Sequence, residues 1–109
     1  MTNHLDTSFA ALADPTRRAI VEHLVTGPAP VSELHAPHDI ALPTFLKHLG
    51  KLESAGLVRS EKKGRVRFVH IETAEMARLE DWISAQRRSW NARLDKLARL
   101  ADTMERTRS

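Results

Sequence analysis

The sequence predicts a small, mainly helical protein with one β-hairpin. Apolar residues recur every three or four positions along most of the chain, which is the spacing of amphipathic helices. The exception is VRSEKKGRVRFVHI, residues 58–71, where β-favouring residues follow a Lys-Gly turn. With 109 residues the chain is long enough for one domain, so we expect a single domain over residues 1–109.

The first two expected helices meet at Asp14 and Pro15. Residues 5–13, LDTSFAALA, place apolar side chains on one helical stripe. Asp14 is a good N-cap and Pro15 fits a first helical turn, so we expect a second helix to start there and to end at Gly27-Pro28. Its inward residues should be Ile20, Val21 and Leu24.

A short third helix over residues 31–36 should stop at Pro37 and be followed by a fourth. The fourth helix is expected from about Pro43 to Ala55, with Gly56 just beyond its end. Its core side should hold Phe45, Leu49 and Leu52. Much of its remaining surface is polar and consists of Thr44, Lys47, His48 and Lys51.

The last helix is expected from about residue 74 to residue 106, with Thr73 as its cap. Its apolar stripe, interrupted at Gln86, comprises Met76, Leu79, Ile83, Trp90, Leu94, Leu97, Ala101 and Met104. The helix could fold back on its own domain or pair with the same helix of a second copy. We favour the dimer because the stripe is longer than so small a domain can cover.

Positive charge is concentrated in the middle of the chain. Residues 43–71 hold seven Lys and Arg against two Glu, a net charge of +5 within a chain whose total is +3. This asymmetry indicates either an anionic partner, most often nucleic acid, or a solvated charged surface.

Composition excludes several other classes of protein. The chain has no cysteine, which rules out disulfides and thiolate metal sites. It has no apolar run long enough to span a membrane and no secretory leader, so we expect a cytoplasmic protein with no membrane partner. No nucleophile–base pair, Gly-rich phosphate loop or metal triad suggests an enzyme.

The third and fourth helices together form a helix-turn-helix candidate, in which helix 43–55 would lie in the DNA major groove. The basic hairpin, residues 58–71, would then be a wing that contacts the DNA backbone or the minor groove. Arg59 could equally pair with a nearby acid. The expected DNA-binding residues are Pro43, Thr44, Lys47, His48, Lys51, Arg59, Lys62, Lys63, Arg65 and Arg67.

Four strings carry a resemblance to a known family: FAALADPTRRAIVEHL, VSEL, LPTFLKHLGKLESAGLV and KKGRVRFVHI. Over residues 8–106 the chain resembles winged helix-turn-helix transcriptional regulators of the ArsR/SmtB type. The resemblance implies a homodimer formed through the first and last helices, which binds a pseudo-palindromic operator and represses transcription until an effector binds. The implied dimer-interface residues are Leu5, Phe9, Leu12, Leu79, Ile83, Trp90, Leu94 and Leu97.

The chain departs from the family at its usual metal sites. Where the metal-sensing branch has a cysteine box after the Glu-Leu pair, this chain has His35, Ala36 and Pro37. Residues 74–106, where another branch binds zinc, contain no histidine. A loop site made by His35, His38 and Asp39 would lack a fourth ligand. We therefore expect no metal and no cofactor, and the effector is unknown.

Two further departures lie in the expected reading helix. Family members often have serine where this chain has Ala41 and Leu46, and those hydroxyls can contact DNA. Leu46 is expected either to pack in the fold or to offer an apolar contact to a thymine methyl. The alternative function is a winged-helix protein-interaction module without specific DNA binding, because fold alone does not fix function.

Overall fold

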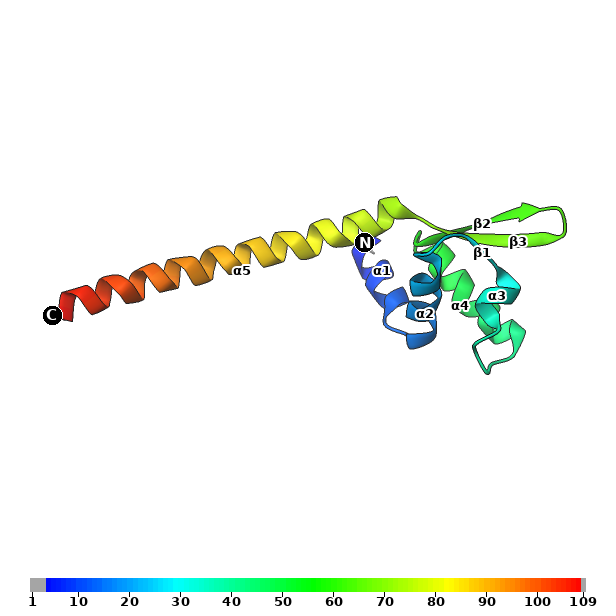
Figure 1. Cartoon of the computed structure of the whole chain (residues 1–109), viewed down its shortest axis with the longest axis horizontal. Coiled ribbons are helices and arrows are strands. Elements are labelled where there is room, and N and C mark those ends of the chain that lie inside the picture. The colour runs from blue at the N-terminus through cyan, green and yellow to red at the C-terminus, as the bar shows by residue number, and fades with distance from the viewer. Residues whose placement is uncertain (1–3, 109) are drawn as a thin grey trace. The chain divides into compact units, whose positions relative to one another are not determined.

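The computed structural model describes residues 4–108, which form five helices and three strands (Figure 1). In chain order these are α1 (His4–Leu12), α2 (Pro15–Leu24), β1 (Ala29–Pro30), α3 (Val31–His35), α4 (Leu42–Ser54), β2 (Val58–Lys63), β3 (Val66–Ile71) and α5 (Thr73–Arg108). They divide into two compact units, Met1–Ala77 and Arg78–Ser109. None of the helices within residues 4–108 is long and apolar enough to cross a membrane.

The junction between α1 and α2 forms as predicted. The Asp14 side chain accepts a hydrogen bond of 3.0 Å from the backbone amide of Arg17, and Pro15 occupies the first turn of α2. This amide bond is the main cause that lowers the pKa of the Asp14 carboxyl below its ordinary value. Asp14 is therefore the N-cap of α2.

The core of the first unit lies between α2, α3, α4 and the sheet. Phe45, Leu49 and Leu52 are fully buried on one side of α4, as their spacing predicted. Ile20, Leu24, Leu34, Leu57 and Val69 complete the fully buried apolar set around them. Gly56 follows α4 with a φ of 75°, a left-handed conformation that confirms its predicted place after the helix end.

The hairpin belongs to a three-stranded antiparallel sheet in the order β1–β3–β2. Lys63 pairs with Val66, so the turn is Gly64-Arg65, and the φ of +63° at Gly64 fits a type II′ hairpin turn. The two-residue strand β1, which pairs Ala29 with Val69, was not predicted. A strand of two residues is too short to show an alternation of apolar and polar side chains. One of its residues is Pro30, which is tolerated because β1 is an edge strand.

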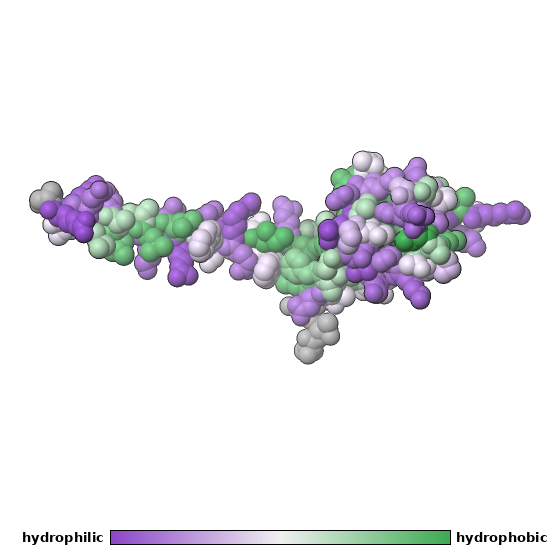
Figure 2. Space-filling model, turned by 90° about the horizontal axis from the view of Figure 1, so that it is seen from below, coloured by the Kyte–Doolittle hydropathy of each residue, from purple (hydrophilic) through white to green (hydrophobic). Residues whose placement is uncertain are grey.

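Helix α5 runs from Thr73 to Arg108, close to the predicted 74–106. It begins at Thr73 itself, so Thr73 is its first residue rather than its cap. Among its apolar residues Trp90, Leu97 and Met104 are each more than half exposed. Figure 2 shows apolar surface along this helix, bordered by polar side chains.

Helix α1 buries small residues rather than its apolar stripe within the described chain. The residues of α1 that are buried are Ser8 and Ala11, whereas Phe9 is 39% exposed. The Ser8 hydroxyl donates a 2.7 Å hydrogen bond to the Glu75 carboxylate, which joins α1 to the first turns of α5. The apolar stripe of α1 is therefore only partly used within the described chain.

The N-cap gives the first testable prediction. Replacing Asp14 with Ala removes the acceptor for the Arg17 amide and should lower the free energy of unfolding at pH 7 by about 1 kcal/mol. The lowered pKa means that the carboxylate stabilises the fold above the acid range and that this contribution is lost as pH falls through the folded-state pKa. Urea denaturation should therefore show the difference between D14A and the unmodified protein shrinking below about pH 4. An equal difference at pH 7 and at pH 2.5 would contradict this.

Candidate nucleic-acid interface

One side of α4 is exposed and carries most of the residues predicted to contact DNA. At 100° per residue Lys47 and Lys51 lie on the side of α4 opposite its buried residues, which are Phe45, Leu49 and Leu52. Exposed side chains on this helix include Leu42, Pro43, Thr44, Leu46, Lys47 and Lys51. Pro43 lies in the first turn of α4, where proline is compatible with helical geometry. The side chains of Lys47 and Lys51 are exposed to solvent.

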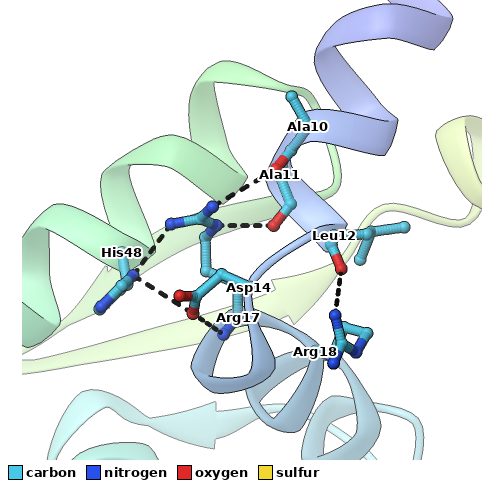
Figure 3. A network of polar contacts seen from close by, with 7 residues as sticks. All are labelled: Ala10, Ala11, Leu12, Asp14, Arg17, Arg18 and His48. Carbon is cyan, nitrogen blue, oxygen red and sulfur yellow. Dashed lines mark hydrogen bonds and ion pairs between the residues drawn. The ribbon is translucent and has the colours of Figure 1, made fainter.

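Unlike the exposed Lys47 and Lys51, His48 is half-buried and takes part in an internal polar network (Figure 3). The Arg17 guanidinium donates to His48 Nδ1 at 3.0 Å and to the backbone oxygens of Ala11 and Ala10 at 2.6 and 3.3 Å. The Asp14 carboxylate lies 3.6 Å from the same Nδ1. Arg17, only 9% exposed, thus connects α1, α2 and α4.

This network defines what His48 can offer to DNA. Arginine has donors only, so Nδ1 of His48 must accept the bond and the neutral ring carries its proton on Nε2. Of the two ring nitrogens, only Nε2 remains for an outside partner. The sequence did not reveal this, because Arg17 and His48 are 31 residues apart.

The hairpin cations fall into two groups. Arg59 forms a 2.7 Å ion pair with Glu72, which is the alternative that the sequence left open for it. Arg67 donates to the Glu53 carboxylate of α4, and Glu53 also accepts a hydrogen bond from Ser60. These contacts fasten the hairpin to the rest of the first unit. Within residues 4–108, no ion pair engages Lys62, Lys63 or Arg65.

The start of α4 and the hairpin border a common groove of about 440 Å³. Leu42 of α4 and His35 of α3 line one side, and Arg65 and Arg67 line the other. Lys47 and Lys51 border a second groove, of about 580 Å³, between α4 and α1. Lys47 and Lys51 have no ion-pair partner in the described part of the chain, and in this they resemble Lys62, Lys63 and Arg65 of the hairpin. The exposed cations therefore extend over α4 and the hairpin.

The histidines near α3 have structural contacts. His35 Nε2 lies 2.7 Å from the backbone oxygen of Ile40, and the rings of His35 and His38 lie 5.0 and 5.7 Å from that of Phe45. His38 is partly buried. The described residues contain no group of three potential metal-binding side chains.

The residues predicted for a dimer interface differ in exposure. Leu79 is 5% exposed and so is already buried within one chain. Leu5 and Leu12 are half-buried. The remaining members are exposed, namely Phe9, Ile83, Trp90, Leu94 and Leu97.

Similar proteins share this arrangement. The helix-turn-helix domain family matches residues 12–61, which contain α2 to α4 and the first four residues of β2. The HTH-type transcriptional regulator Rv2034 of Mycobacterium tuberculosis is 36% identical over 98 residues, 90% of this chain and 89% of the relative. The transcriptional repressor SdpR of Bacillus subtilis is 25% identical over 79 residues, 72% of this chain and 88% of the relative.

Solved structures agree with these relatives. The ArsR family transcriptional regulator RHA00566 is 47% identical with a TM-score of 0.77, over 82% of this chain and 98% of that one. The homodimeric winged helix-turn-helix DNA-binding domain of Mb0332 from Mycobacterium bovis is 25% identical with a TM-score of 0.63, over 78% and 79% of the two chains.

The fold and the exposed basic surface define a winged helix-turn-helix DNA-binding protein. The chain belongs to the ArsR family of transcriptional regulators.

The Arg17 network generates the second prediction. Arg17→Met keeps a long side chain but removes every donor, which leaves two backbone oxygens and His48 Nδ1 without their partner. We expect the free energy of unfolding to fall by about 2–3 kcal/mol in urea denaturation. The matched control is Arg18→Met, because Arg18 makes one exposed bond to Leu12 and its loss should cost less than about 1 kcal/mol. Equal effects of the two substitutions would contradict the structural role of Arg17.

Proposed function

We propose that this chain is a homodimeric repressor that places α4 in the major groove and uses the β2–β3 hairpin as its wing. The observation that carries the proposal is the set of five exposed cations without an ion-pair partner among the described residues. They are Lys47, Lys51, Lys62, Lys63 and Arg65. Clustered cations with no internal partner fit a polyanion better than they fit the stability of the fold.

The chemistry assigns different tasks to the two elements. A single α-helix fits the major groove, where base edges carry a distinct pattern of donors and acceptors. Lys47 and Lys51 lie about one helical turn apart and can meet a phosphate or a guanine edge. The hairpin, with Arg65 at its turn, is suited to the DNA backbone or the minor groove. Binding of this kind releases counterions, so affinity should fall steeply with salt.

Dimerisation supplies the second reading helix. Trp90, Leu94 and Leu97 form an exposed stripe on α5, and stripes of this size usually pack against a partner. Mb0332, a homodimer of the same fold, supports this assignment. Two copies of α4 related by a two-fold axis would bind a pseudo-palindromic operator. Repression is supported by SdpR, and we propose it for this chain on that similarity.

A repressor of this kind must reach chromosomal DNA, so we propose that the protein is located in the cytoplasm. We assign it no enzymatic activity, because the function proposed for its exposed residues is DNA binding. A small-molecule effector remains compatible with the grooves beside α4.

The third prediction tests DNA binding. Fluorescence anisotropy on duplexes selected from the source genome should give tight, sequence-selective binding with a steep salt dependence. Lys47→Ala and Arg65→Ala should each weaken binding and reduce the slope of log K against log salt by about 0.9, without changing thermal stability. Lys96→Ala on α5 is the matched control and should change neither quantity.

A different result would favour the alternative function. Weak, salt-insensitive binding to every duplex, with the variants folded, would support a protein-interaction module instead. Loss of thermal stability in K47A or R65A would show that these side chains serve the fold and not DNA.

The fourth prediction concerns the dimer. Trp90→Asp introduces a carboxylate into the exposed stripe, and burying it unpaired at an interface would be costly. Light scattering should show a dimer for the unmodified protein and a shift towards monomer for W90D. Arg99→Asp, on the opposite side of the same helix, should remain dimeric. An unchanged dimer mass for W90D would place the interface elsewhere.

A further inference from the structure

Two leucines on α4 keep exposed surface at the edge of the helix's buried apolar side. Leu42 is 46% exposed and Leu46 is 37% exposed, whereas Phe45, Leu49 and Leu52 have no exposed surface. Leu42 and Leu46 are four residues apart, so they project from one side of the helix, one turn from each other. The sequence left open whether Leu46 packs in the fold, and its exposure shows that much of it does not.

Packing within the first unit explains only part of these two side chains, because each is more than half buried but keeps apolar surface open to solvent. Lysine and glutamine form helices about as well as leucine, so helix propensity does not require an apolar residue there. The exposed part of each leucine gains nothing from burial in the free protein. The pair therefore fits a contact with a partner that carries apolar groups.

The surroundings of the leucines indicate the chemistry of that partner. Lys47 is adjacent to Leu46, and Leu42 shares its groove with Arg65, one of the five cations without an ion-pair partner among the described residues. The partner must therefore be anionic around a small apolar group. DNA meets this description, because the C5-methyl of thymine is the apolar group that bases present in the major groove.

We propose that Leu42 and Leu46 are specificity-determining residues that recognise the C5-methyl groups of thymines in the operator. This inference rests on the proposed function, to which it adds the base class that α4 selects. Four residues of helix rise about 6 Å, and base pairs are spaced by about 3.4 Å. The two thymines in each half-site should thus lie one or two base-pair steps apart.

The experiment uses the full chain and the duplex it selects from genomic fragments. Each thymine of the duplex is replaced in turn by deoxyuridine, which removes only the methyl group, and affinity is measured by anisotropy. We expect one or two positions per half-site where this substitution weakens binding about fourfold. At each such position, the variant that lacks the leucine in contact with that thymine, either Leu42→Ala or Leu46→Ala, should bind the thymine and deoxyuridine duplexes equally.

Val25→Ala is the matched control, since Val25 is 70% exposed and lies outside α4 and the hairpin. It should keep the full discrimination between thymine and deoxyuridine. Thermal melts should show V25A unchanged and L42A and L46A only modestly destabilised, because each leucine keeps part of its side chain in the fold, and affinities are compared where all variants are folded.

Four results would overturn the inference. Specific binding that no deoxyuridine substitution weakens, or discrimination that persists in both L42A and L46A, would reject methyl recognition while leaving DNA binding intact. A lower dimer mass for L42A or L46A would identify a second copy as the occupant of this surface. Failure of the folded protein to select any DNA would reject the proposed function as well.

Discussion

The guanidinium of Arg17 is the contact on which the arrangement of the first unit depends. The guanidinium nitrogens donate to two backbone oxygens at the end of α1 and to the ring of His48 on α4. The backbone amide of Arg17 donates to the Asp14 carboxylate. Helix ends leave backbone oxygens without partners, and a buried unpaired oxygen is costly. One side chain thus satisfies the end of one helix and fixes the position of another.

The consequence for function is the orientation of α4. Because Arg17 and the apolar core hold one side of this helix, its opposite side faces solvent with Lys47 and Lys51, and Leu42 and Leu46 lie at the edge of the buried side. Glu53 performs a similar task for the hairpin by accepting hydrogen bonds from Ser60 and Arg67. Two of the seven cations in residues 43–71, Arg59 and Arg67, are therefore tied to acids of the fold, which leaves five for a partner.

Sequence reasoning succeeded where structure is locally encoded. The cap at Asp14, the left-handed Gly56 and the buried side of α4 follow from residue type and spacing within a few positions. It missed contacts between distant residues, such as the bond of His48 to Arg17 and that of Ser8 to Glu75, 67 positions apart. Such pairs leave no periodic pattern. For the candidate site, the basic segment was evident from composition, but which cations are already paired required coordinates.

We propose that one surface, formed by α4 and the hairpin, contacts DNA. Amide chemical-shift mapping of isotopically labelled protein, titrated with a selected duplex at constant salt, would locate that surface residue by residue. We expect shifts or broadening concentrated in residues 43–51 and 59–67, with residues 94–104 of α5 unaffected. Changes concentrated in α5, or absent from α4 despite saturation with DNA, would contradict it.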